Sequence, residues 1–193
     1  MDIDRRCFCA LGLGLGALAL TGLSASAAEE FGPRIGAKAP AIGTPQDQTG
    51  KARSLESLMG ANGLVLFFFR SAAWCPFCQA QMMELNGGIA EIEKRGYRLA
   101  GISFDKTNVQ KDFVAKRGIK YDLLSDPGSV VIDRWALRDP QYAQGSFAYG
   151  VPRPIIFVIG RDGIIKSKLY EDTYTKRPLV RVVLETLDKT AKS

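Results

Sequence analysis

The sequence predicts an α/β fold in which a central mixed β-sheet is covered by helices on both faces. Strand-like apolar runs alternate with helix-like segments along the chain, which is typical of this class. The run 64–69 is apolar at every position, so we expect a strand that is buried on both faces. Residues 155–170 contain two strand-like runs joined by Gly160-Arg161-Asp162-Gly163, which predicts a hairpin and therefore antiparallel pairing in the same sheet.

The first segment, residues 1–28, has the composition of an export signal. It contains Arg5-Arg6-Cys7-Phe8, which is similar to a twin-arginine signal, although an ordinary secretory signal is the alternative. The apolar stretch 10–23 has 14 residues, which is short for a spanning helix, and 25–27 reads Ala-Ser-Ala, a cleavage site. We therefore expect 29–193 to form one domain in the periplasm or otherwise exported, with no stable membrane span after cleavage.

The middle of the chain carries alternating helix and strand signals. Residues 31–50 are rich in Gly, Pro and polar residues and predict an extended lead-in, after which Ser54 is placed to cap a short helix over 55–59. After the buried strand, a helix is expected from Pro76 to Arg95, with a kink or break at Gly87-Gly88 because each glycine weakens a helix by roughly 1 kcal/mol. The remaining elements are strands over 97–104 and 121–124, helices over 108–117 and 127–135, an irregular loop over 136–150 that covers the site, and a closing helix near Val180.

The motif Trp74-Cys75-Pro76-Phe77-Cys78 lies between the buried strand and this helix. Proline is favoured at the first helical position, so Pro76 predicts that the helix begins there with Cys75 as its cap. A cap thiol would face solvent, and the helix N-terminus would lower its pKa from ~8.5 to ~7, so we expect Cys75 to be the nucleophile. Cys78 begins an apolar stripe that continues through Met82, Leu85, Ile89 and Ile92, so we expect Cys78 to be shielded and to resolve the mixed disulfide.

The composition excludes several kinds of site. The chain of 193 residues has no histidine, and its four cysteines become two once residues 1–28 are removed. A c-type haem needs Cys-x-x-Cys-His, whereas Gln79 follows the pair here, and zinc needs about four Cys or His ligands. We therefore expect no metal and no cofactor. The net charge of +6 comes without a basic stripe interleaved with aromatic residues, so nucleic acid is not an expected partner.

Several blocks carry a resemblance to a known family. They are 36–40 (Gly-Ala-Lys-Ala-Pro), 101–105 (Gly-Ile-Ser-Phe-Asp), 123–127 (Leu-Leu-Ser-Asp-Pro), 157–163 and, most specific, the motif 74–78. Over about residues 35–187 the chain is similar to the thioredoxin-like superfamily, and within it to the peroxiredoxin-like branch of alkyl hydroperoxide reductase and thiol-specific antioxidant (AhpC/TSA) proteins. The resemblance implies a thioredoxin-like fold and an antioxidant oxidoreductase with a redox-active Cys75–Cys78 disulfide. Its partners would be protein or small-molecule thiols and disulfides, hydroperoxides in the alternative, and an unidentified electron donor or acceptor.

The resemblance also implies residues that support the cysteines. Thioredoxin-like proteins have a cis-proline beside the dithiol, and Pro154 matches that place better than Pro152 because a strand follows it directly. A cis bond there would turn the backbone of Arg153 towards the sulfurs; two ordinary trans prolines are the alternative.

Other candidate site residues are singled out by the sequence itself. Arg70, at the end of the buried strand, either adds positive potential beside Cys75 or is solvated. The aromatic side chains of Trp74, Phe77, Phe147 and Tyr149 either form an apolar rim for substrate or pack within the fold.

One departure from the family pattern decides how the functional hypotheses are ordered. Peroxiredoxins carry Pro-x-x-x-Thr/Ser-x-x-Cys, but here Ser71 and Cys75 hold the first two places if Cys78 is the reactive cysteine, and Phe68 and Ala72 hold them if Cys75 is. We therefore expect an exported thiol–disulfide oxidoreductase in which Cys75 attacks. The first alternative is a thiol peroxidase whose sulfenic acid is resolved as the Cys75–Cys78 disulfide. The second is a non-enzymatic domain in which that disulfide is structural.

Overall fold

The apolar run becomes the strand at the centre of the sheet, as the sequence predicts. A computed structural model of the chain describes residues 31–191, so the predicted export signal lies outside the described residues. In this part of the chain, strand β2 (Gly63–Phe68) is buried at all of its positions. It pairs in parallel with β3 (Tyr97–Ser103) on one side and antiparallel with β5 (Ile155–Gly160) on the other. The sheet is therefore mixed, as expected.

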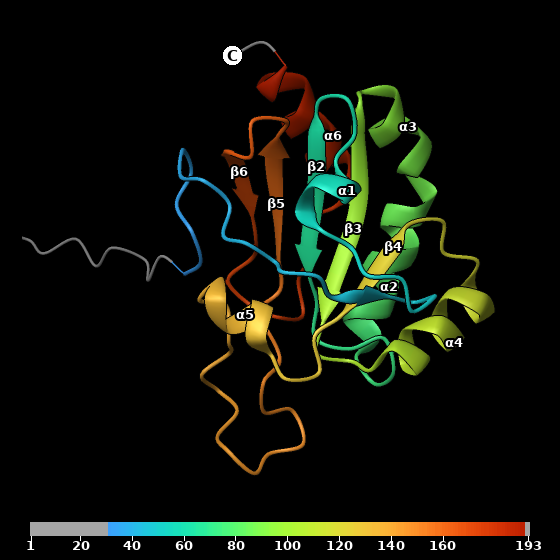
Figure 1. The fold of residues 1–193 in the computed structure, drawn as a ribbon, viewed down its shortest axis with the longest axis vertical. Coiled ribbons are helices and arrows are strands. Elements are labelled where there is room, and N and C mark those ends of the chain that lie inside the picture. Colours follow the sequence, from blue (N-terminus) through green and yellow to red (C-terminus); the bar gives the residue numbers. More distant parts are fainter. Residues whose placement is uncertain (1–30, 192–193) are drawn as a thin grey trace, which may run out of the picture. The chain divides into compact units, whose positions relative to one another are not determined.

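The other strands extend this sheet on both sides (Figure 1). On one side β4 (Asp122–Ser125) follows β3 in parallel, and β1 (Gln46–Asp47) pairs antiparallel with β4. On the other side β6 (Ile165–Leu169) completes the predicted hairpin with β5. The order across the described sheet is β1-β4-β3-β2-β5-β6. The two-residue strand β1 lies in the segment that we expected to be an extended lead-in.

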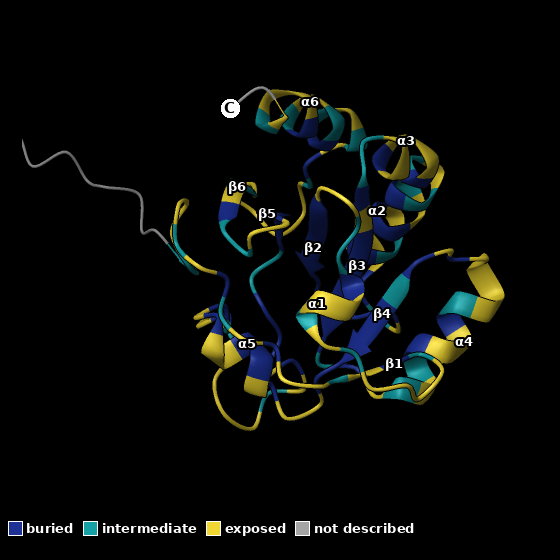
Figure 2. Ribbon diagram, turned by 45° about the horizontal axis from the view of Figure 1, so that its top comes forward, coloured by how far each residue is buried: buried dark blue, intermediate teal, exposed yellow. Residues whose placement is uncertain are grey.

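Helices cover both faces of the sheet, which confirms the predicted fold class. They are α1 (Leu55–Leu58), α2 (Pro76–Gly87), α3 (Ile89–Lys94), α4 (Thr107–Arg117), α5 (Val130–Arg134) and α6 (Val180–Thr190). One hydrophobic core joins alternate residues of β2, such as Phe67, to buried side chains of α2, α3, α4 and α6. The second core joins the intervening residues, such as Phe68, to side chains of α1 and α5. The central strands β2, β3 and β5 accordingly show as mostly buried in Figure 2, whereas most exposed residues lie on the helices and loops.

The helix expected from Pro76 to Arg95 is divided at Gly88, where α2 ends and α3 begins. A Cβ atom at Gly88 would overlap the Cγ2 methyl of Val180, so glycine allows α6 to approach this point closely. The apolar stripe from Cys78 to Ile92 is buried along both helices, as predicted. The division therefore keeps the predicted face against the sheet while making room for α6.

Two other segments, α5 and the loop 136–150, can be compared with the bounds that the sequence predicts. Helix α5 begins at Val130 rather than at Pro127, because Ser129 adopts a left-handed conformation with φ of 56°. The carboxylate of Asp126 accepts hydrogen bonds from the backbone N–H groups of residues 130, 131 and 132, each at 2.9 Å, and so caps this helix. The loop 136–150 has no helix or strand, as expected. Within residues 31–191, none of the helices is long and apolar enough to cross a membrane.

Candidate functional site

The two cysteines of the motif lie at the first turn of α2, where the sequence places them. Pro76 occupies the start of the helix and Cys75 is its N-cap, with its sulfur accepting a hydrogen bond from the backbone N–H of Cys78 at 3.4 Å. Both thiols are unbonded to each other in this structure. The predicted exposure of Cys75 is wrong, however, because Cys75 is 1% exposed and Cys78 is 0% exposed.

Two segments that are distant in the sequence approach Cys75. Tyr142, from the loop 136–150, and Arg177, from the segment between β6 and α6, both lie close enough to interact with the charge of Cys75. A helix N-terminus alone would leave the cap residue open to water. The loop 136–150 is expected to cover the site, but nothing in the local sequence indicates that the segment carrying Arg177 also approaches it. Burial removes the basis for expecting an exposed nucleophile.

The acidity of the two thiols is also the reverse of the prediction. Burial would by itself raise the pKa of Cys78, but hydrogen bonds from the Cys75 thiol and the Ser71 backbone N–H, together with the charge of Arg177, lower it to about 6. The pKa of Cys75 is raised, first because its thiol donates that hydrogen bond to Cys78 and second because it is buried. These opposite shifts favour a thiolate on Cys78 and a proton on Cys75.

Arg177 is a site residue that the sequence analysis missed. Its Nη2 donates to the Cys78 sulfur at 3.6 Å, while its Nε is buried and has no hydrogen-bond partner among the described residues. The residue lies in an irregular segment, and no motif or periodicity marks it. Only the return of the chain from β6 to α6 brings it to the cysteines. A guanidinium beside a thiol stabilises the thiolate, so Arg177 belongs to the chemistry of the site.

Arg70 is near the cysteines, as expected, but it is not a solvated side chain. It is 4% exposed, and its guanidinium carbon lies 5.1 Å from the ring centre of Trp74, 5.0 Å from that of Tyr142 and 4.3 Å from that of Tyr174. It also donates a hydrogen bond to the Tyr142 hydroxyl. Cation–π contacts of this kind stabilise a buried guanidinium, and no carboxylate among the described residues forms an ion pair with Arg70. Arg70 thus joins the motif to two covering segments.

The four aromatic side chains predicted to form a rim are only partly together. The ring of Phe147, which is 76% exposed, lies 5.2 Å from the ring of Trp74. Phe77 instead contacts Tyr174, with 6.1 Å between ring centres, and Tyr149 lies against the guanidinium of Arg138. Trp74 and Phe147 therefore make one exposed aromatic edge beside the motif, and Phe77 makes a separate contact.

The expectation for Pro154 and Arg153 is wrong. Every peptide bond within residues 31–191 is trans, so Pro154 is an ordinary trans proline. The backbone N–H of Arg153 donates to the carbonyl of Leu137 at 2.7 Å, and its guanidinium lies 4.8 Å from the ring centre of Phe31. The backbone of Arg153 is therefore engaged by the segment that precedes it, an interaction that a sequence pattern does not reveal.

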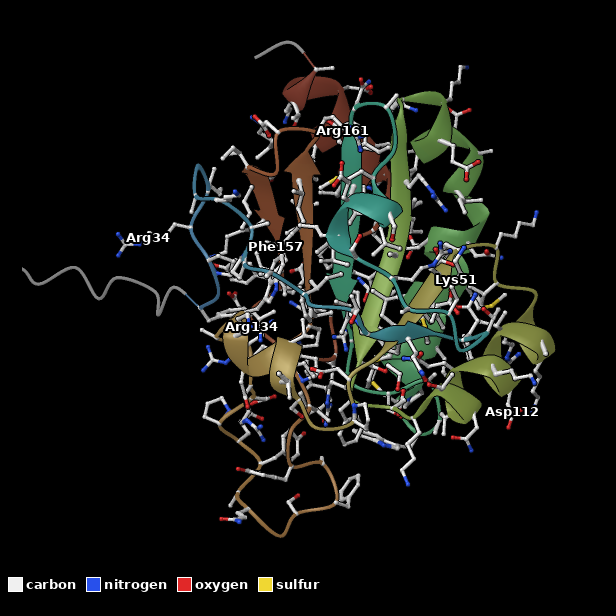
Figure 3. The ribbon with its side chains drawn as sticks, viewed as in Figure 1. Arg34, Lys51, Asp112, Arg134, Phe157 and Arg161 are labelled. Carbon is white, nitrogen blue, oxygen red and sulfur yellow. The ribbon has the colours of Figure 1, made fainter. Side chains whose placement is uncertain are left out.

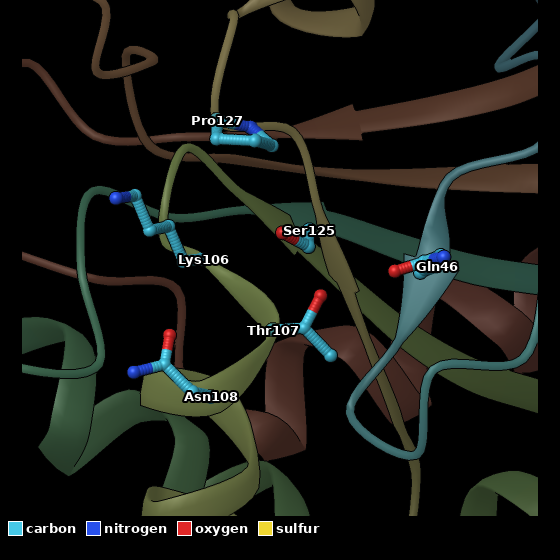
Figure 4. Close-up of a pocket in the computed structure, with 6 residues that line it drawn as sticks. All are labelled: Gln46, Lys106, Thr107, Asn108, Ser125 and Pro127. Carbon is cyan, nitrogen blue, oxygen red and sulfur yellow. The ribbon is translucent and has the colours of Figure 1, made fainter.

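Further features lie on the described surface away from the cysteines. A pocket of about 510 Å³ is lined by Gln46, Lys106, Thr107, Asn108, Ser125 and Pro127 (Figure 4), but none of the site residues named above is among them. Within residues 31–191, no group of three or more Cys, Asp or Glu side chains is placed to hold a metal ion. The basic side chains labelled in Figure 3, Arg34, Lys51, Arg134 and Arg161, come from four separate segments rather than from one stripe.

Comparison with known proteins identifies what this arrangement resembles. The model of the AhpC/TSA family matches residues 35–168, a range that includes both cysteines but ends before Arg177. Peroxiredoxin Bcp of Escherichia coli K12 is 31% identical over 142 residues, which is 74% of this chain and 88% of that protein. The crystal structure of peroxidoxin BcpB from Mycobacterium tuberculosis is similar with a TM-score of 0.69 and 24% identity, over 81% of this chain and 97% of that one. The structure of Enterococcus faecalis AhpC has the same TM-score of 0.69 with 18% identity, over 82% and 92%. These two likenesses confirm the predicted thioredoxin-like fold.

Proposed function

Because this chain belongs to the AhpC/TSA family of peroxiredoxins, we propose that it is a thiol peroxidase in which Cys78 attacks a hydroperoxide and Cys75 then closes a disulfide with it. Membership of the family makes the chain a thiol-dependent oxidoreductase, as expected. The proposal exchanges the predicted roles of the two cysteines and takes peroxide reduction, the first alternative, as the main activity. The observation that carries it is the lowered pKa of Cys78 beside Arg177, with the protonated Cys75 next to it.

The first step needs only the groups described. The Cys78 thiolate attacks the terminal oxygen of the hydroperoxide, so that an S–O bond forms and the O–O bond breaks. The alkoxide leaves and takes up a proton, which yields an alcohol and a sulfenic acid on Cys78. A pKa of about 6 keeps Cys78 ionised at neutral pH. The guanidinium of Arg177, whose Nη2 lies 3.6 Å from the Cys78 sulfur, would stabilise the thiolate and the negative charge that develops on the leaving oxygen.

The second step follows from the loss of the negative charge on Cys78. While Cys78 is a thiolate, it raises the pKa of Cys75 by accepting its hydrogen bond and by its negative charge. Once Cys78 is a neutral sulfenic acid, both causes disappear and Cys75 ionises more readily. Cys75 then attacks the Cys78 sulfur, the S–S bond forms, the S–O bond breaks, and hydroxide leaves as water. An external dithiol supplies the two electrons that reduce the disulfide, and the step is thiol–disulfide exchange.

The burial of both sulfurs favours peroxide reduction by Cys78 over the other two functional hypotheses. A small hydroperoxide reaches a buried thiolate more easily than a protein disulfide does, so disulfide exchange is better placed in the recycling half of the reaction. A structural disulfide gives no reason for an ionised Cys78 and a guanidinium beside it.

We also propose that the chain is exported through residues 1–28. Replacing Arg5 and Arg6 by lysine in the full chain is expected to prevent export in cell fractionation if the signal is of the twin-arginine type.

Single-turnover kinetics test the peroxidase proposal. The reduced protein is mixed with hydrogen peroxide or cumene hydroperoxide in a stopped-flow instrument. We expect Cys78→Ser to abolish peroxide consumption, and Cys75→Ser to keep one turnover and to accumulate a sulfenic acid that dimedone traps. A wild-type rate no greater than that of free cysteine would reject the proposal, and one turnover retained in Cys78→Ser but lost in Cys75→Ser would restore the original roles.

A further inference from the structure

A buried carboxylate that the proposed reaction does not use lies behind the cysteine motif. Asp105 follows β3 and is buried. Its Oδ1 accepts from the Ser71 hydroxyl at 2.8 Å, and its Oδ2 accepts from the Ala72 backbone N–H at 2.7 Å and from the Ser103 hydroxyl at 2.9 Å. Burial raises the pKa of Asp105, while these hydrogen bonds oppose that effect. Among the described residues, no lysine or arginine contributes to the pKa shift of Asp105.

Ser71 links Asp105 to the turn that leads to the motif. While its hydroxyl donates to Asp105, the same oxygen accepts from the backbone N–H groups of Ala73 at 3.0 Å and Trp74 at 3.4 Å. Residues 71–74 are therefore held to the end of β3 by one carboxylate and one hydroxyl. Cys75 follows this turn directly, so its position at the cap of α2 depends on the turn.

The same turn presents a donor to the thiolate. The backbone N–H of Ser71 is one of the groups that lower the pKa of Cys78. Ser71 stands at the place where the peroxiredoxin pattern has proline, and proline has no N–H to donate. This departure from the pattern argued against peroxide reduction at the level of the sequence. In the folded protein it leaves a backbone N–H that helps to lower the pKa of Cys78.

We propose that Asp105 is a positioning residue for Cys78: through Ser71 it holds the 71–74 turn so that the Ser71 N–H and the Cys75 thiol both face the Cys78 sulfur. This inference deepens the proposed function, since it concerns the same thiolate. Asp105 acts through the turn and does not touch the substrate. If its role were only to stabilise the fold, its loss would lower the stability and leave the acidity of Cys78 unchanged.

The test is Asp105→Asn, which keeps the size of the side chain. The asparagine amide has only one accepting oxygen, so its NH2 group would face either the N–H of Ala72 or the hydroxyl of Ser71, and in both cases one of the bonds that hold the turn is lost. We expect the pKa of Cys78, measured by the pH dependence of iodoacetamide alkylation with mass-spectrometric assignment of the modified cysteine, to rise by about one unit, which is a roughly tenfold loss of thiolate at pH 5. If Asp105 acted through its own negative charge, its removal would instead lower that pKa.

The matched control is Asp126→Asn. Asp126 is also buried, its pKa is also raised by burial, and it also binds backbone N–H groups, but it caps α5 rather than the cysteine turn. This variant is expected to lose stability and to keep the Cys78 pKa of the wild type. Ser71→Ala, which removes the link and keeps the Ala72 bond, is expected to give a smaller rise in the same direction and decides the case if Asp105→Asn does not fold.

An unchanged or lowered Cys78 pKa in Asp105→Asn, or in Ser71→Ala if the first variant does not fold, would overturn the inference. Because alkylation needs no peroxide, the result is independent of the peroxidase proposal. A raised pKa in a protein whose wild type reduces peroxide no faster than free cysteine would reject the proposed function and leave the positioning role of Asp105 in place.

Discussion

The guanidinium of Arg177 lies against the sulfur of Cys78, with 3.6 Å between Nη2 and Sγ, although the two residues are 99 positions apart in the sequence. Arg177 lies outside the range that matches the AhpC/TSA family. The segment that carries it also carries Tyr174, which lies over Arg70. The return of the chain from β6 to α6 therefore closes the site and supplies its cation.

Replacing Arg177 by glutamine is expected to slow peroxide consumption about tenfold at pH 6 and to raise the pKa of Cys78, because the thiolate loses its positive neighbour. Lysine at the same position should restore part of the rate, since it keeps the charge but not the planar donor group. Arg181→Gln is the control, because Arg181 is exposed and pairs with Glu185 on the surface of α6. Equal rates in Arg177→Gln and Arg181→Gln would contradict the role of Arg177.

The rate of peroxide consumption should depend on pH with a midpoint near 6, since the pKa of Cys78 is lowered to about 6. The reactive form is the thiolate, so the second-order rate constant rises as the pH rises through this value and is level above about pH 7. Below the midpoint it falls about tenfold for each unit of pH. Stopped-flow measurements from pH 4.5 to 8.5 check this. A midpoint near 8.5, the ordinary value for cysteine, would show that the site does not activate Cys78.

Tyr142→Phe is expected to lower the free energy of unfolding by about 1 to 2 kcal/mol, because the buried guanidinium of Arg70 loses the hydroxyl that accepts its hydrogen bond. Denaturant titration measures this change. Alkylation of Cys75 in the native protein should also become faster, since Tyr142 belongs to the loop that covers it. Tyr170→Phe serves as the reference, because the exposed Tyr170 packs its ring on Phe31. If both variants behave alike, the hydrogen bond to Arg70 does not hold the loop.

Gly88→Ala is expected to destabilise the protein by about 1 to 3 kcal/mol, because the new methyl group overlaps Val180 at the closest approach of α6. Gly87→Ala, one residue earlier in α2, meets no atom within 4 Å and should be neutral or stabilising by up to about 1 kcal/mol. Thermal unfolding of the two variants side by side gives the comparison. A melting temperature of Gly88→Ala equal to or above that of Gly87→Ala would argue against close packing of α6 on Gly88.

The sequence predicted most of the architecture because the signals that specify it are local. The uninterrupted apolar run indicated β2, the turn residues 160–163 indicated the hairpin of β5 and β6, and Pro76 indicated the start of α2. The stripe that begins at Cys78 indicated which face of α2 and α3 is buried. Each of these depends on spacing over a few residues or on the conformational limits of one residue type, which a sequence shows directly.

The sequence by itself determined the α/β fold with helices on both faces, the place of the cysteine pair at the start of α2, and the family. Only the tertiary structure decided in which direction the pKa of each thiol is shifted, that Cys75 is buried, that Pro154 is trans, and that Arg70 and Arg177 reach the site. The physical reason is that the pKa of a buried thiol depends on every donor and charge around it, whatever its distance along the chain. For Cys78 these groups come from Ser71, Cys75 and Arg177, and local periodicity cannot bring them together.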